Sequence, residues 1–94
     1  MGLFKSVDEK FEEIGFIKTN EDTLYVVYER KDEKHKFTQC LYLAHRHNGR
    51  HTIQSYDPLL MDEKRIGNTC VGLTMYEAKL CIKKMKEKGW RIIK

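Results

Sequence analysis

The chain has 94 residues, of which 40% are hydrophobic and 34% are charged. This length favours a single domain over residues 1–94, and the content of apolar side chains excludes a disordered tail. Uncharged stretches such as Phe37–Ala44 are too short to span a bilayer. Cys40, Cys70 and Cys81 lack a paired spacing, so we expect reduced thiols in a soluble, cytoplasmic protein.

Charge is distributed unevenly along the chain, whose net charge is +4. Residues 1–33 carry five basic and nine acidic side chains, whereas residues 34–94 carry thirteen basic and five acidic ones. A field of this polarity steers an anionic partner towards the second part of the chain.

Residues 6–15 have the pattern of a short capped helix. Ser6 and Glu9 form a capping box, in which each side chain accepts a hydrogen bond from the other residue's backbone N–H. Gly15 supplies a left-handed ending, after which Phe16 can fold back. The buried stripe is predicted to consist of Val7, Phe11 and Ile14.

Three stretches rich in β-branched and aromatic residues follow, and they predict an antiparallel meander. Lys31–His35 is the first turn, and Asn48-Gly49 favours a two-residue type I′ turn as the second. The predicted strands are Thr23–Arg30, Lys36–Arg46 and His51–Tyr56.

These turns also predict a register. A four-residue turn at Lys31–Lys34 would place Tyr28 opposite Phe37, and a two-residue turn at Asn48-Gly49 would place Ala44 opposite Ile53. The core face would then collect Leu24, Val26, Tyr28, Phe37, Leu41, Leu43 and Tyr56. The opposite face would collect Tyr25, Val27, Thr38, Cys40, Tyr42, Ala44, Ile53 and Ser55.

The segment after the meander has weaker signals. Asp57-Pro58 resembles a helix start, so a short helical turn is possible to about Arg65. Thr69–Leu73 could add a fourth, short edge strand.

The last element is a long helix with a second capping box, formed by Thr74 and Glu77. Gly89 ends it, and Trp90 can return onto the helix. Its buried face is predicted to consist of Ala78, Cys81, Ile82 and Met85.

Together these elements define an α+β fold of two layers: an N-terminal helix, a three-stranded antiparallel meander with a possible fourth edge strand, and a long C-terminal helix. If both helices cover one face of the sheet, the other face stays open. An apolar patch of this kind favours a protein partner, often a second copy of the chain. The candidate interface consists of Tyr25, Val27, Tyr42 and Ile53.

Basic residues suggest nucleic-acid binding as the alternative function. Arginine forks suit phosphate oxygens, and a hairpin can reach into a groove. The candidate contacts are five residues of the predicted hairpin tip and three of the last helix: His45, Arg46, His47, Arg50, His51, Lys79, Lys83 and Lys86.

Neither a metal site nor an active site is predicted. His45 and His47 alternate onto one face and could share a metal ion, but His51 falls on the other face and no acidic residue completes a ligand set. A solvated basic loop is the more ordinary interpretation. Glycine-rich phosphate loops and nucleophile–base motifs are absent, so we expect no enzyme, no cofactor and no small-molecule substrate.

The order of these signatures resembles that of small uncharacterised proteins encoded by phages and prophages of low-GC Gram-positive bacteria. The similarity rests on Glu13–Phe16, on the strand end Tyr28–Lys31, and on a Thr-x-x-Glu-capped helix that ends at Lys88–Trp90. It implies an accessory protein of a mobile element, and it carries over no functional residue.

Overall fold

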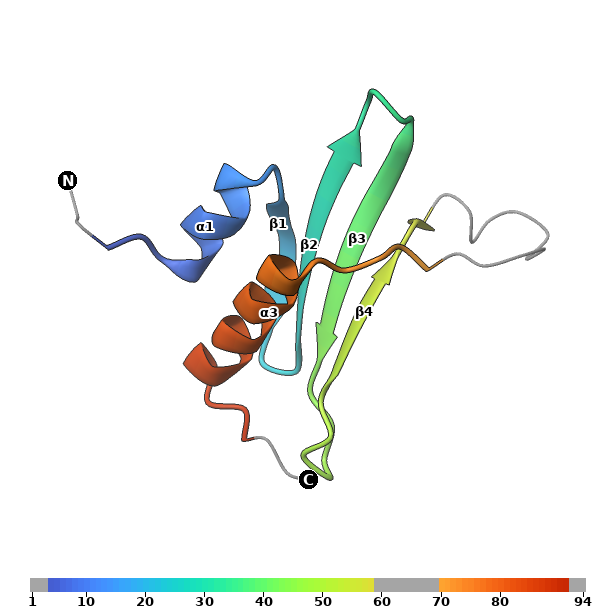
Figure 1. Ribbon diagram of the computed structural model, residues 1–94. Helices are drawn as coiled ribbons and strands as arrows, with labels where there is room; N and C mark the ends of the chain where they lie inside the picture. Colours follow the sequence, from blue (N-terminus) through green and yellow to red (C-terminus); the bar gives the residue numbers. More distant parts are fainter. Residues whose placement is uncertain (1–3, 59–69, 92–94) are drawn as a thin grey trace.

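A computed structural model describes residues 4–58 and 70–91 and contains an antiparallel four-stranded sheet with both helices on one of its faces (Figure 1). The strand order in the sheet is β1-β2-β3-β4, which is also the order along the chain. The elements are α1 (Val7–Glu13), β1 (Ile17–Asp22), β2 (Tyr25–Asp32), β3 (Phe37–Ala44), β4 (Thr52–Tyr56) and α3 (Met75–Glu87). The predicted α+β class is therefore confirmed.

Strand β1 was not predicted, and it makes the sheet four-stranded instead of three-stranded. All of its residues are exposed, so its sequence lacks the apolar alternation by which strands are recognised. The fourth strand was expected at Thr69–Leu73 instead. Within the described part of that range, Cys70 forms only an isolated bridge to Tyr56, and the Val71 N–H donates to the Ser55 carbonyl. Most of the possible helical turn after Pro58 lies outside the described residues.

Both helices have the predicted capping residue at the N-terminal end and the predicted glycine after the C-terminal end. Ser6 with Glu9 and Thr74 with Glu77 form complete capping boxes. At the C-terminal ends, the Phe16 N–H donates to the Phe11 carbonyl and the Trp90 N–H to the Met85 carbonyl. Each return follows a glycine with positive φ, which only glycine adopts without strain. At 13 residues, α3 is of ordinary length and not the long helix expected.

The register of β2 and β3 differs from the prediction by four residues. Tyr28 pairs with Leu41 and not with Phe37, because β2 continues to Asp32, two residues beyond its predicted end, and the turn falls at residues 33–36. An even shift keeps every side chain on its predicted face. Leu24 is an exception, because it lies in the turn between β1 and β2, where 54% of it is exposed.

The register of β3 and β4 is shifted by one residue, which exchanges the faces of β4. Leu43 pairs with Ile53, and Cys40 with Tyr56. The reason lies in the turn, where Gly49 has positive φ but Asn48 does not, and the Gly49 N–H donates to the Arg46 carbonyl. The last pair, Ala44 with Thr52, leaves a seven-residue loop, residues 45–51, in place of the two-residue type I′ turn predicted. Ile53 therefore faces the helices, and Tyr56 faces away.

The hydrophobic core lies between the sheet and the helices. Phe11 of α1 stacks on Tyr28 of β2 at 4.0 Å between ring centroids. Phe16 packs edge-on against Phe11. The buried core consists of Phe11, Phe16, Val26, Tyr28, Leu41, Leu43, Leu80, Cys81, Met85 and Trp90. At about 25 cal/mol per Å² of apolar surface, burial of this set is the main force that holds the two layers together.

Two charged residues of α3 also face the core, which the apolar pattern did not predict. Glu77 and Lys84 are buried, whereas Ile82, expected inside, is 39% exposed. Ala78, also expected inside, is only half-buried. Buried charges are tolerated only when they are paired and hydrogen-bonded, and both of these are.

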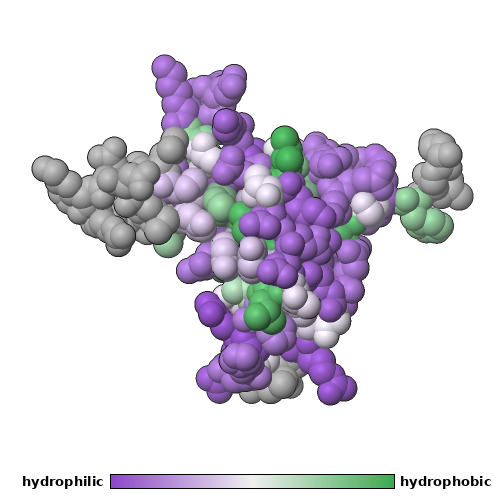
Figure 2. Space-filling model, turned by 180° about the vertical axis from the view of Figure 1, so that it is seen from behind, coloured by the Kyte–Doolittle hydropathy of each residue, from purple (hydrophilic) through white to green (hydrophobic). Residues whose placement is uncertain are grey.

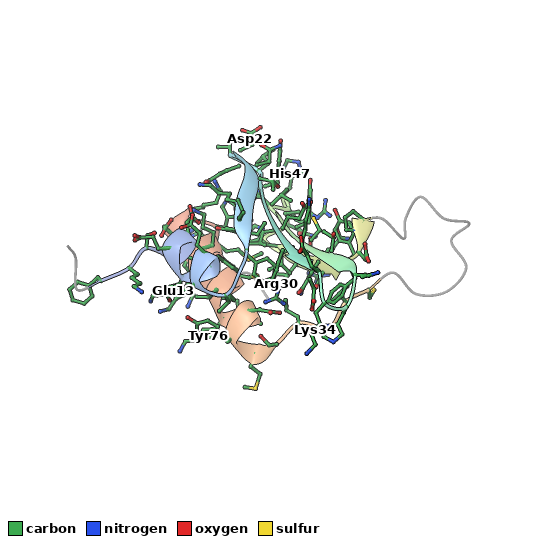
Figure 3. All side chains as sticks on the ribbon, turned by 90° about the horizontal axis from the view of Figure 1, so that it is seen from above. Glu13, Asp22, Arg30, Lys34, His47 and Tyr76 are labelled. Carbon is green, nitrogen blue, oxygen red and sulfur yellow. The ribbon has the colours of Figure 1, made fainter. Side chains whose placement is uncertain are left out.

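Glu77 belongs to a polar cluster that fixes the N-terminal end of α3 to the sheet. Its carboxylate accepts a hydrogen bond from Arg30 at 3.0 Å and another from the backbone N–H of Thr74. Arg30 also donates to Gln39, which is itself buried, and its guanidinium lies over the Phe16 ring. Figure 3 shows Arg30 between the sheet and α3.

Lys84 belongs to a second cluster, which joins α3 to α1 and β1. Its ammonium lies 3.2 Å from an Asp8 oxygen and 3.6 Å from a Glu21 oxygen. Burial raises the pKa of Asp8, but hydrogen bonds from Lys18, Tyr28 and Lys84 outweigh it, so this pKa lies below its ordinary value. The hydrogen bond from Lys18 is the main cause that lowers the pKa of Glu21 to about 2.

We predict that Glu77→Ala lowers the free energy of unfolding by about 3 kcal/mol, because it leaves Arg30 and Gln39 without their shared acceptor. Urea melts followed by circular dichroism measure this value. Glu12→Ala is the control, since it removes an exposed helical carboxylate that forms no ion pair with a described residue, and it costs about 0.5 kcal/mol or less. A loss below about 1 kcal/mol for Glu77→Ala would show that the cluster does not anchor α3.

We also predict that acid destabilises the protein through Asp8 and Glu21. Their pKa values are lower in the folded state, so they contribute stability above the unfolded pKa, and this contribution is lost as the pH falls through the folded pKa. The melting temperature should fall progressively between about pH 5 and pH 2. This fall should be smaller in Asp8→Asn/Glu21→Gln than in the control Glu12→Gln/Glu33→Gln. Equal pH profiles for the two double variants would contradict the assignment.

Candidate functional site

The sheet face opposite the helices, here called the free sheet face, gathers three of the four predicted interface residues. Tyr25, Val27 and Tyr42 lie on it and are half-buried. The rings of Tyr25 and Tyr42 are parallel within 5°, with centroids 5.8 Å apart. Ile53, the fourth predicted residue, packs against the core on the other side and is not part of this face.

Tyr56 takes a place on the free sheet face that the sequence did not predict. It pairs with Cys40, a buried residue of the same face. The hydrogen bond with Cys40 and partial burial raise the pKa of Tyr56 to about 12. The phenol is therefore neutral at physiological pH. Thr38 and Ala44 of β3 also lie on this face and are almost completely buried. The apolar and aromatic side chains that form its surface are the tyrosines, Val27 and Ile17, which pairs with Glu29 and is 64% exposed.

Charges on the free sheet face are few. Asp22, Glu29 and Lys31 share it, because they pair with Tyr25, Cys40 and Thr38. Figure 2 shows the molecule from this side, with pale and green side chains among purple ones. With two acidic residues and one basic one, the face offers no net attraction to a polyanion. Its chemistry is that of a protein interface, where tyrosine is enriched and charge is depleted at the centre.

The hairpin tip, residues 45–51, carries the predicted basic cluster and lies against the C-terminal end of α3 (Figure 1). His45 and His51 pack on each other and on Trp90, with ring centroids 4.5 to 5.4 Å apart. The sequence placed these two histidines on opposite faces. That prediction is wrong because the one-residue shift between β3 and β4 brings His51 to the side of His45.

His51 joins two separate parts of the chain through its ring nitrogens. Nδ1 accepts a hydrogen bond from the Arg46 N–H at 3.0 Å, so in this geometry the ring is neutral and the proton is on Nε2. Nε2 in turn donates to the Arg91 carbonyl at 2.7 Å. Neither nitrogen is left to bind a metal ion. Among the described residues, no group of three or more His, Cys, Asp or Glu side chains could hold one.

A hollow of about 250 Å³ lies between the tip and the end of α3. Arg91, which the sequence did not place in the basic cluster, joins it through the docking of Trp90. Burial is the main cause that lowers the pKa of His45, and the neighbouring His51 and His47 rings lower it further. The lining residues are His45, Arg46, His47, Gly49, His51, Gly89 and Arg91. Arg50 does not line it.

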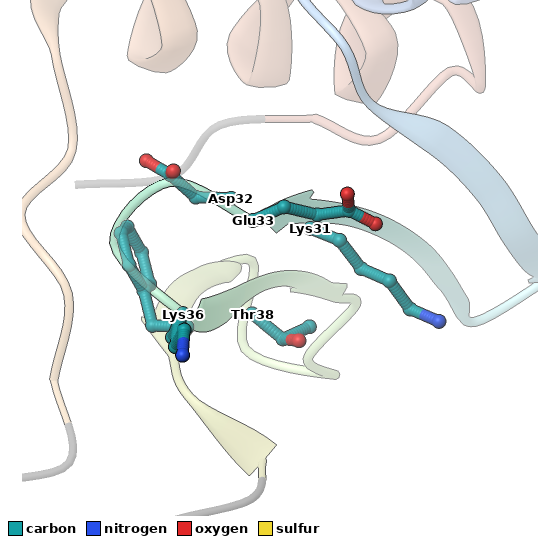
Figure 4. Close-up of a pocket in the computed structure, with 6 residues that line it drawn as sticks. Lys31, Asp32, Glu33, Lys36 and Thr38 are labelled. Carbon is teal, nitrogen blue, oxygen red and sulfur yellow. The ribbon is translucent and has the colours of Figure 1, made fainter.

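The three predicted lysines of α3 form a separate group on its outward face. Lys79, Lys83 and Lys86 line a shallow groove together with Met75, Ala78 and Ile82. A further hollow at the opposite end of the sheet, by the turn between β2 and β3, has residues of both signs (Figure 4). There the ends of Lys31 and Lys36 lie apart, and Asp32 accepts hydrogen bonds from His35. The charged groups around this last hollow therefore do not converge on one point, as the groups of a binding site would.

No protein-family model, curated protein or solved structure was found that matches this chain. The resemblance to phage and prophage proteins therefore stays a prediction. In the part of the chain that is described, no helix is both long and apolar enough to cross a membrane.

We predict that Trp90→Ala lowers the free energy of unfolding by about 3 kcal/mol, as large-to-small changes in a core do. The indole is buried, donates to the Thr23 carbonyl at 3.3 Å and supports both histidine rings. Denaturant melts measure the loss, and Arg91→Ala is the control because its side chain is exposed. A change of less than about 1 kcal/mol would mean that the C-terminal return does not stabilise the fold.

Proposed function

We propose that this protein is a non-enzymatic interaction module that self-associates through its free sheet face. The observation that carries the proposal is the asymmetry of the sheet. Both helices pack on one face, and none of the described elements covers Tyr25, Val27, Tyr42 and Tyr56 on the other. A continuous patch of tyrosines on a small protein is a typical partner-binding surface.

A second copy of the chain fits this face better than it fits a sheet edge. The outer edge strand, β1, is polar and has an irregular register between Lys18 and Asn20, features that prevent edge-to-edge pairing. The other edge strand, β4, is already paired in part by Cys70 and Val71. Two flat faces, by contrast, can pack at about 10 Å with aligned strands, as in a β-sandwich.

The size of the face favours a weak dimer. Four strands of up to eight residues cover roughly 20 by 25 Å at the usual spacings, or about 500 Å² per copy. A standard stable interface buries about 800 Å² per partner. Self-association should therefore depend on concentration. An accessory role in a mobile element is the biological context that the resemblance to phage proteins implies, and the gene neighbourhood tests it.

We predict that Tyr42→Asp weakens dimerisation at least tenfold, because a carboxylate at the centre of the interface would be buried without a partner. Sedimentation equilibrium over a range of concentrations measures the effect. Tyr76→Asp is the matched control, since Tyr76 is 46% exposed on α3, away from the free sheet face (Figure 3).

Val27→Lys provides a second variant on the same face, in case Tyr42→Asp impairs folding. Wild-type protein that remains monomeric at millimolar concentration would overturn the proposal. So would an equal loss of self-association in Tyr76→Asp.

A further inference from the structure

We propose that Arg46 and Arg91 form a binding site for the phosphate groups of a nucleic-acid strand, in the hollow between the hairpin tip and the end of α3. The site is on a different surface from the free sheet face, and it does not depend on self-association. Its two arginines are 45 positions apart in the sequence, yet they line one hollow of about 250 Å³. Such a space is much larger than the ~30 Å³ of a water molecule.

His51 fixes the relative position of the two arginines. One nitrogen of its ring accepts from the Arg46 N–H, and the other donates to the Arg91 carbonyl. The ring is held in turn between His45 and Trp90. The backbone at both arginines is therefore held before a ligand arrives, which reduces the ordering cost of binding.

The positive charge of this hollow is not neutralised within the described residues. None of its lining residues is acidic, and neither Arg46 nor Arg91 takes part in an ion pair with a described residue. Each guanidinium therefore keeps its fork of donors, which matches phosphate oxygens in pairs. Gly89 in the lining allows a close approach, because the space beside its α-carbon is open.

The arrangement of further cations favours a strand over an isolated phosphate. Lys79, Lys83 and Lys86 follow one side of α3, at a spacing that puts them in one stripe. This helix ends beside the hairpin tip (Figure 1). A row of cations that leads to a paired-arginine hollow matches the repeating charge of a phosphodiester backbone. The tip is the loop at the end of the two-stranded ribbon of β3 and β4, and the major groove of a duplex admits such a ribbon.

The test measures fluorescence anisotropy with labelled single-stranded and duplex DNA of about 20 nucleotides, longer than the ~4–16 nucleotides of a typical single-strand site. Arg46→Gln/Arg91→Gln should weaken binding at least tenfold. It should also reduce the slope of log affinity against log salt by about 1.4–1.8 between roughly 50 and 200 mM salt, since two phosphate contacts are lost. The matched control is Lys31→Gln/Lys34→Gln, which removes the same charge at the opposite end of the sheet and should change affinity less than twofold.

His51→Phe tests the positioning role of His51. It keeps an aromatic ring against Trp90 but removes both hydrogen bonds, so affinity should fall although both arginines remain. Circular dichroism melts of each variant confirm that it is folded. The proposal is overturned if wild-type protein does not bind at about 50 mM salt. It is also overturned if both double variants lose affinity equally, or if polyglutamate of equal charge displaces the DNA as well as unlabelled DNA does.

Discussion

Helix α3 is anchored to the sheet at both of its ends, and the rest of the structure depends on these two anchors. At the first, Glu77 accepts hydrogen bonds from Arg30 and from the Thr74 N–H, so one carboxylate caps the helix and pairs with the sheet. At the second, Trp90 returns onto Met85 and packs against His45 and His51. Leu80, Cys81 and Met85 fill the space between the anchors. A helix fixed in this way covers one face of the sheet only, and the other face stays available.

The same anchors also explain why the two candidate surfaces are different in chemistry. The free sheet face presents tyrosines and few charges because strands β2 and β3 alternate between core and surface. The hollow at the hairpin tip presents arginines because Trp90 brings Arg91 to Arg46. One surface is suited to a second copy of the chain, and the other to an anionic strand.

Local features of this fold could be predicted from the sequence, and non-local features could not. The capping boxes and glycine endings involve residues within six positions of each other, so the sequence contains both partners in a recognisable pattern. Strand β1 was missed because its exposed, polar residues have no apolar period. The inward position of Glu77 and Lys84 was missed because Arg30, Asp8 and Glu21, which make it tolerable, are at least 47 positions away.

The residues of the two candidate surfaces were predicted only in part, because their positions also depend on contacts between distant parts of the chain. Tyr25, Val27 and Tyr42 were placed correctly, since the shift between β2 and β3 is even. Ile53 and Tyr56 lie on the faces opposite to those predicted, because the register of β3 and β4 is shifted by one residue. Arg91 was not grouped with Arg46, because only the docking of Trp90 brings them together. A register and a docking contact are both settled by tertiary packing, which no pattern in a single sequence records.

The central claim is that one face of this sheet is covered within the chain and the other by a second copy. Fluorine NMR of protein labelled with 3-fluorotyrosine tests it directly, because the five tyrosines include Tyr28 in the core, Tyr76 on α3, and Tyr25, Tyr42 and Tyr56 on the free sheet face. As concentration rises, the resonances of Tyr25 and Tyr42 should shift while those of Tyr28 and Tyr76 stay constant. Resonances that are all independent of concentration, or a shift confined to Tyr76, would contradict it.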